Sequence, residues 1–289
     1  MSFFITFYRA VEMELSMTSS QGHGPFAPFA CVWRHRQLLH RLIERDVTVR
    51  FKGSVLGKLW FILLPLAMLA FYTIVFGVII QPRWQESVQG PWEVALRYFA
   101  GLTVFNFYIE CINRAPTLML EHVTYIKKIL FPVELLAWTV LGGAVFRFIV
   151  SCGPLMVFYM ALHGVPPASA VAVPLLILPL ALFAVGFVWF LSAIGIFLRD
   201  TNHIVAAVTP VIMFISPIFY PLAAVPERLQ KLYYANPLTF ALEDVRAALF
   251  SGSVHISPGF IVYCLSGWVF AWLGYLCFVK LRPTFADFV

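Results

Sequence analysis

The chain has 289 residues, of which 61% are hydrophobic and only 12% are charged, and its formal net charge is +6. Because about 25% of the residues of a soluble domain are charged, this composition excludes an ordinary soluble protein and indicates that lipid surrounds much of the chain. In so apolar a chain, excess positive charge is typical of cytoplasmic loops that contact anionic lipid. It does not indicate a nucleic-acid partner.

The N-terminal segment has no spanning character. Residues 1–32 contain several Gly, Pro and Ser residues, and they lack the basic start and long apolar stretch of a signal peptide. We expect them to form a flexible cytoplasmic tail.

Residues 33–58 are predicted to form an amphipathic helix. One face of it is apolar at helical spacing and consists of Leu38, Leu39, Leu42, Ile43 and Val47. The other face carries charged and polar side chains. A helix of this kind directly before a span typically lies in the plane of the membrane interface.

The pair Gly57-Lys58 looks like the end of a nucleotide-binding P-loop, but its surroundings exclude that site. A P-loop needs the pattern G-x-x-x-x-G-K-[ST], whereas Gly53 and Gly57 are one residue too close and Leu59 follows the lysine. We interpret the two glycines as the turn from a helix lying flat to a helix crossing the membrane.

Six later segments are apolar enough to predict membrane spans, for which about 20 residues are needed. They are residues 59–80, 98–112, 135–162, 171–198, 204–220 and 260–281. The second is short and is interrupted by Asn106 and Glu110. The sequence therefore predicts an all-α integral membrane protein with a transmembrane domain at 59–282 and a short cytoplasmic tail at 283–289. Most lysines and arginines then fall on one side, which places both termini in the cytoplasm.

Two connecting segments have a character of their own. The segment between Pro116 and Pro132 reads as a short cytoplasmic helix, which is either a solvated connector or a docking surface for a soluble partner. The outer loop at 216–252 has four prolines and many aromatic residues, so we expect helices that fold back into the membrane as a lid or gate.

These segments together resemble the membrane subunit of type-2 ABC exporters, in the branch that exports O-antigen, capsule and teichoic-acid polysaccharides. The likeness covers residues 38–282 and rests on RDVTVRFKGSVLGKLWFILLPL, YIKKILFPVELL, LRD and SPIFYPLAAVPERLQKLYYANPLTFALEDVRAALFSG. It implies a homodimer in the bacterial cytoplasmic (inner) membrane, working with two copies of a separate ATPase that binds ATP and Mg. It also implies an undecaprenyl diphosphate-linked glycan as the substrate.

The resemblance places a coupling helix, which docks on the ATPase, in the segment after the second span. Its predicted contact residues are Leu118, Glu121, His122, Tyr125, Lys127 and Lys128.

Four cations of the amphipathic segment are candidates for binding the diphosphate head group. They are Arg41, Arg45, Arg50 and Lys52. Arginine pairs with such groups bidentately, although plain anchoring of a positive segment at the inner leaflet is the alternative interpretation.

Aromatic residues are candidates for lining a glycan path, because sugars stack their C–H faces on aromatic rings. The set, drawn from spans one, two and five, consists of Trp60, Phe61, Phe71, Tyr72, Phe105, Phe107, Tyr108, Phe219 and Tyr220. Ordinary packing or contact with lipid is the alternative for each of them.

One arginine, Arg147, falls in the middle of the third span, where an ionisable group is costly and marks either function or pairing. We expect a structural ion pair, with Glu110 as its partner, or a charge that faces the pore. Arg199 and Asp200 are expected to close the turn after the fourth span.

The predicted function is therefore a permease for lipid-linked polysaccharide, without an enzymatic site of its own. We expect it to bind no metal and no cofactor, since its five cysteines and seven histidines show no ligand spacing. The alternatives are a permease for a drug or small lipid, an integral membrane transferase, or an assembly scaffold. A transferase would need converging acidic or histidine residues, whereas the 14 acidic residues are dispersed.

Overall fold

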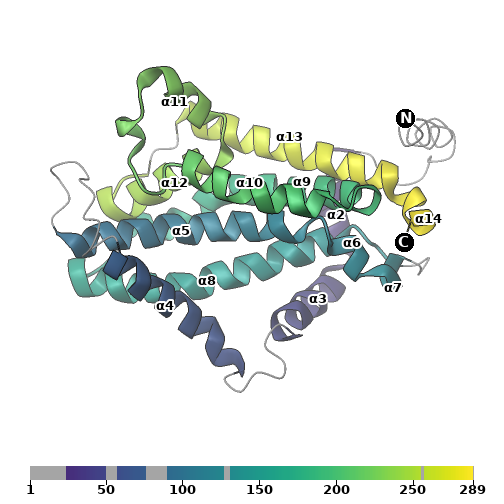
Figure 1. Cartoon of the computed structure of the whole chain (residues 1–289), viewed down its shortest axis with the longest axis horizontal. Coiled ribbons are helices and arrows are strands. Elements are labelled where there is room, and N and C mark those ends of the chain that lie inside the picture. Colours follow the sequence, from purple (N-terminus) through teal and green to yellow (C-terminus); the bar gives the residue numbers. More distant parts are fainter. Residues whose placement is uncertain (1–23, 50–56, 76–89, 127–130, 255–256, 289) are drawn as a thin grey trace.

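The structure is a computed structural model that describes residues 24–49, 57–75, 90–126, 131–254 and 257–288. Throughout these ranges the regular structure is helical and contains no strand (Figure 1). The predicted all-α class is therefore confirmed.

Long helices run side by side and form the body of the bundle, and shorter helices lie at its two ends (Figure 1). In chain order, the helices are α2 (Ala27–Arg34), α3 (Arg36–Val49), α4 (Trp60–Tyr72), α5 (Pro91–Arg114), α6 (Leu118–Glu121), α7 (Val123–Ile126), α8 (Leu135–His163), α9 (Val173–Phe197), α10 (Thr201–Ile215), α11 (Glu227–Tyr234), α12 (Pro237–Arg246), α13 (Pro258–Leu281) and α14 (Phe285–Phe288). Helices α6, α7 and α14 lie at one end, and α11 lies towards the other.

Among the described residues, three helical segments are long and apolar enough to cross a membrane: Leu135–His163, Ala168–Phe197 and Pro258–Thr284. They coincide with the third, fourth and sixth predicted spans, so the chain is a multi-pass membrane protein. Two shorter apolar helices, Ile62–Val75 and Thr201–Ile215, occupy the places of the first and fifth. Residues 76–80 of the first predicted span lie outside the described ranges.

The second predicted span is longer than the sequence indicated. Helix α5 has 24 residues and begins at Pro91 instead of residue 98. The charged residues of its first turns pair with each other, since Arg97 and Glu93 lie 2.7 Å apart at helical spacing. The Arg97 guanidinium also lies 4.4 Å from the centre of the Phe250 ring. Because the two charges are paired, the first turns of α5 can lie against the other helices.

Helices α9 and α13 approach each other closely, and glycines make this contact possible. A Cβ atom added to Gly274 would lie 2.9 Å from the carbonyl carbon of Gly186, and one added to Gly267 would lie 2.9 Å from the Pro179 oxygen. Small residues permit such close approach of membrane helices, whose association depends on van der Waals packing. Four of the apolar helices also contain an internal proline: Pro65 in α4, Pro154 in α8, Pro179 in α9 and Pro210 in α10.

The described parts of the two predicted tails, residues 24–32 and 283–288, are largely helical. Helix α2 begins at Ala27, inside the predicted N-terminal tail, and the Phe29 ring packs 5.7 Å from that of Trp138. At the C-terminus, Phe285 is fully buried and its ring contacts those of Phe278 and Phe197. Aromatic contacts therefore hold α2 and α14 on the bundle, and no periodicity in such short segments signalled this. Residues 1–23 and 289 lie outside the described ranges.

The segment at 216–252 is folded, as its prolines and aromatic residues indicated. Helix α12 packs against α5 and α9, and its Leu238 and Leu242 are fully buried. The buried guanidinium of Arg246 donates hydrogen bonds to the carbonyls of Pro217 and Ile218, which follow the end of α10. The start of this loop is thus fixed to α12.

Candidate functional site

Helix α5 carries a stripe of polar residues along one face. Thr103, Asn106, Glu110 and Asn113 follow one another at steps of three and four residues, which places them on the same side of the helix. From Glu93 to Arg114, only Asn106 and Asn113 are exposed, while most of the remaining residues are buried. We call these four residues the polar stripe.

The polar stripe lies between the two short apolar helices, α4 and α10, both of which pack against α5. On the α10 side, the Thr209 hydroxyl donates a hydrogen bond of 2.7 Å to the Asn113 side-chain oxygen. On the α4 side there is a cavity of about 470 Å³, bounded also by α8. The whole stripe lines this cavity, together with Trp60, Tyr72, Arg147 and Ser151.

Among the aromatic residues predicted to line a path, the described side chains of α4 are accessible. Trp60 and Tyr72 line the cavity, and Phe71 is 57% exposed. Beyond α10, the Phe219 ring contacts that of Tyr98, and the Tyr220 hydroxyl lies 2.7 Å from that of Tyr233. The side chain of Phe61 lies outside the described part of the structure.

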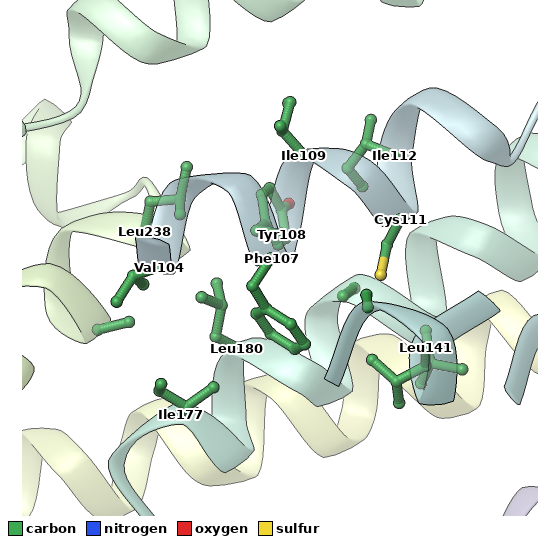
Figure 2. Close-up of a cluster of buried hydrophobic side chains, with 14 of the residues drawn as sticks. Val104, Phe107, Tyr108, Ile109, Cys111, Ile112, Leu141, Ile177, Leu180 and Leu238 are labelled. Atoms are coloured by element: carbon green, nitrogen blue, oxygen red, sulfur yellow. The ribbon is translucent and has the colours of Figure 1, made fainter. Parts of the chain in front are cut away.

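The prediction is wrong for the three aromatic residues of α5. Phe105, Phe107 and Tyr108 are each at most 4% exposed. Figure 2 shows Phe107 and Tyr108 within a cluster of buried hydrophobic side chains that includes Leu180 of α9. The three residues lie off the face of the polar stripe and fill the core.

The mid-span arginine is paired, as one of the two alternatives predicted. Arg147 Nε lies 2.6 Å from a carboxylate oxygen of Glu110, and the two side chains are 17% and 18% exposed. A second pair lies close by, where Arg114 holds Asp46 of α3 by two hydrogen bonds of 2.6 and 2.9 Å. Two acids and two bases therefore join α3, α5 and α8, and we call them the charge quartet.

Sequence reasoning missed Asp46, although a signal existed. Asp46 falls on the apolar face of the amphipathic helix, three residues after Ile43. A carboxylate at such a position is costly unless it finds a partner. Its place on the apolar face thus predicted a cation on the neighbouring helices.

The predicted coupling segment forms two separate single turns, α6 and α7, instead of one helix. His122 ends α6 outside helical geometry, and its Nδ1 atom lies 2.9 Å from the Leu118 carbonyl oxygen. Leu118 is buried on the bundle, so it does not present a side chain to a partner, whereas Glu121 is exposed. Tyr125 is partly buried. Lys127 and Lys128 lie outside the described residues.

Of the four predicted head-group cations, the structure describes two. Arg41 and Arg45 are exposed on α3, and Arg50 and Lys52 lie outside the described ranges. Arg45 is already engaged, because its guanidinium donates to the Tyr125 hydroxyl at 2.5 Å. A second cavity has a volume of about 480 Å³. Its lining residues include Arg45, Arg114, Glu121, His122 and Tyr125. In the part of the chain that the structure describes, no group of three or more potential metal ligands converges.

Comparisons with known proteins agree with this architecture. Residues 37–250 match the family described as ABC-2 type transporter. The chain is 24% identical over 258 residues to an O-antigen export system permease protein RfbA from Myxococcus xanthus, which covers 89% of this chain and 96% of that protein. Two proteins of the same name from Klebsiella pneumoniae are each 23% identical over 252 residues, covering 86% of this chain and 94% of each of them.

Proposed function

The chain belongs to the ABC-2 type transporter family, and we propose that it is the membrane permease of an exporter for a lipid-linked polysaccharide. The observation that carries this proposal is the polar stripe of α5, which places amide, hydroxyl and carboxylate groups along one cavity between mostly apolar helices. Relatives that cover nearly the whole chain are named as O-antigen export permeases, which supports the same substrate class.

The stripe suits a glycan because sugars present hydroxyl groups around their edges and C–H groups on their faces. Asn106 and Asn113 offer both donors and acceptors, and the neighbouring Trp60 and Tyr72 offer ring faces. A lipid anchor needs no such lining, since it remains in the hydrocarbon. In our proposal the glycan passes along the stripe, between α4 and α10, and leaves past Phe219 and Tyr220.

A second copy of the chain would complete the path. Helices α4 and α10 both leave large apolar side chains uncovered, among them Ile62, Phe71, Val208 and Phe214, which are 44–62% exposed. Closing α4 and α10 of two copies around the stripes would give a homodimer with a lined corridor. In this arrangement α4, α5 and α10 complete six spans, α11 and α12 form the outer re-entrant gate, and both termini lie in the cytoplasm.

A separate ATPase, in two copies, would supply the energy. We place its docking surface on α6 and α7, and the ATP and Mg²⁺ on the ATPase. In this scheme Arg41, with Arg50 and Lys52, meets the diphosphate of an undecaprenyl-linked substrate at the inner leaflet of the bacterial cytoplasmic membrane. Arginine and lysine attract such groups at an interface.

One observation favours a rival, a permease for a small lipid or drug. An apolar groove of about 840 Å³ lies between α4 and α8, lined by residues such as Leu66, Phe146 and Val157. Such a groove suits a hydrocarbon chain. A lipid permease would use this groove and would not need the polar stripe, so substitutions at the two places separate the proposals.

The test is a gene deletion in the source bacterium, complemented with variants. We expect the deletion strain to accumulate lipid-linked glycan inside the cell, and the wild-type gene to restore surface glycan. Asn106→Leu should fail to restore it, whereas Val262→Leu on the exposed face of α13 should succeed. Normal surface glycan in the deletion strain would overturn the proposal. Full restoration by Asn106→Leu, with loss on Val157→Trp, would favour the rival.

A further inference from the structure

Helix α3 rests on the bundle without burying a single residue. Its apolar face, including Leu39, Leu42 and Ile43, is only partly covered. It sits on α8 at two glycines, where a Cβ atom at Gly142 would lie 2.7 Å from Ile43 Cγ1 and one at Gly143 would lie 2.6 Å from an Asp46 carboxylate oxygen. Ile43 and Asp46 occupy the space that the two glycines leave, so α3 approaches α8 closely although its apolar face stays partly open.

Polar contacts hold α3 at two points. The inner point is the charge quartet, in which Asp46 is bound bidentately by Arg114 beside the Glu110–Arg147 pair. The outer point is Arg45, whose guanidinium donates to the Tyr125 hydroxyl and lies 5.8 Å from the centre of its ring. Charge-assisted hydrogen bonds of this kind are strong and directional.

The outer contact ties α3 to the segment that we propose as the ATPase docking surface. Helix α7 buries none of its own residues. Its Tyr125 ring stacks on Phe131 at 4.3 Å and on His122 at 5.8 Å, so the hydroxyl held by Arg45 belongs to a rigid aromatic stack. A movement of this stack therefore acts directly on Arg45.

Next to this contact, a cavity separates α6 and α7 from α3 and from one side of α8, while α6 packs directly on α9. It has a volume of about 480 Å³ and lies between α3, α6, α7 and α8, with Leu136 and Val140 among its lining residues. Packed side chains transmit displacement, whereas an open space does not. The Arg45–Tyr125 contact bridges this space at its edge.

We propose that Arg45 and Tyr125, with the Asp46–Arg114 pair as the second point of hold, transmit displacement of the α6–α7 segment to α3 during each cycle of ATP hydrolysis. The proposal rests on the proposed function, in which α6 and α7 receive the ATPase. Because Arg114 lines the cavity beside the polar stripe, displacement of α3 acts on this cavity through the Asp46–Arg114 pair. All four are positioning residues in this scheme, and none of them is required to touch the glycan.

The experiment uses the complete complex of this chain with its ATPase, reconstituted in lipid vesicles and measured in two ways. The rate of ATP hydrolysis is measured from the phosphate released. Export is measured as the lipid-linked glycan that appears on the far side of the vesicle membrane. The quantity compared is glycan exported per ATP hydrolysed. Tyr125→Phe removes only the hydroxyl and keeps the ring stack and the charge of Arg45. Arg36→Gln is the matched control, since Arg36 is an exposed arginine of the same helix outside both contacts.

We expect Tyr125→Phe to lower the export per ATP by about two- to fivefold, the range for a partly exposed charged contact, with hydrolysis maintained. Asp46→Asn should lower it by about tenfold or more because that pair is better buried. The swap Asp46→Arg with Arg114→Asp should recover part of this loss, which would show that the ion pair itself carries the effect and not either side chain alone. Arg36→Gln should leave the ratio unchanged.

Two results separate this inference from the proposed function. If the wild-type complex hydrolyses ATP but exports no glycan of any kind, the proposed function fails. If the wild-type complex exports glycan and both Tyr125→Phe and Asp46→Asn keep its export per ATP, the function stands and the transmission role is wrong. A fall in hydrolysis and export in equal proportion would also contradict it, because that pattern reports a lost ATPase contact.

Discussion

The glycine contact between α9 and α13 allows a sharp prediction about stability. In Gly274→Ala the new Cβ atom would lie 2.9 Å from the carbonyl carbon and 3.0 Å from the Cα atom of Gly186, and closer still to its oxygen. All these atoms belong to the backbone, so no side chain can rotate away. To reach ordinary contact at 3.4 Å, the two helices must separate by at least about half an ångström. Overpacking of this kind costs about 1–3 kcal/mol, and the better helix propensity of alanine offsets about 0.5–1 kcal/mol of it.

The assay is thermal unfolding of the purified protein in detergent, followed by tryptophan fluorescence. Each kcal/mol corresponds to an apparent Tm shift of about 2–4 °C in a chain of this size class, so Gly274→Ala should unfold several degrees earlier. Gly153→Ala is the matched control: Gly153 lies within α8, and a Cβ atom there would meet nothing within 4 Å. The control should be neutral or slightly stabilised. Equal Tm values for the two variants would refute the close-packing argument.

Three further predictions concern the two ends and the outer loop. Phe285→Ala should destabilise the protein by about 3–5 kcal/mol because its ring is fully buried, whereas Phe288→Ala, at a ring that is 44% exposed, should cost far less by the same unfolding assay. Arg246→Gln should cost about 2–4 kcal/mol, since two carbonyls lose a charged donor, and limited proteolysis should then cut within 216–252; an unchanged cleavage pattern would contradict the anchoring role. Burial, assisted by Glu134, raises the pKa of the Cys31 thiol from 9.0 to about 11, so its thiolate fraction at pH 8 should be lower and maleimide labelling about a hundredfold slower than for an ordinary thiol; equal labelling rates would disprove it.

The long periodic elements were predictable from the sequence, because their physical cause is local. The helical periodicity that predicted the amphipathic helix is seen in α3. Its partly covered face consists of Leu38, Leu39, Leu42, Ile43 and Val47. The apolar lengths that predicted spans three, four and six match α8, α9 and α13 closely. Such patterns record which face or length must avoid water.

The site was predicted less well because residue type does not reveal which way a side chain faces. Phe105, Phe107 and Tyr108 have rings on which a sugar can stack, but they lie on the buried side of α5. The spacing of Asn106, Glu110 and Asn113 indicates a shared polar face, but the sequence does not show which helices border it. The position of Asp46 on the apolar face indicates that it needs a cation, but only tertiary packing decides that this cation is Arg114.

Internal prolines distinguish the two helices beside the polar stripe from the helix that carries it. Each proline removes one backbone hydrogen bond and so allows its helix to bend there. The uncovered helices α4 and α10 both have such a point, at Pro65 and Pro210, whereas α5 and α13 have none within their length. In the corridor that we propose, α4 and α10 are therefore able to bend, whereas α5, which carries the polar stripe, has no such point. In that scheme, a polymer whose thickness varies from one sugar to the next passes as α4 and α10 bend, while the polar stripe keeps its position.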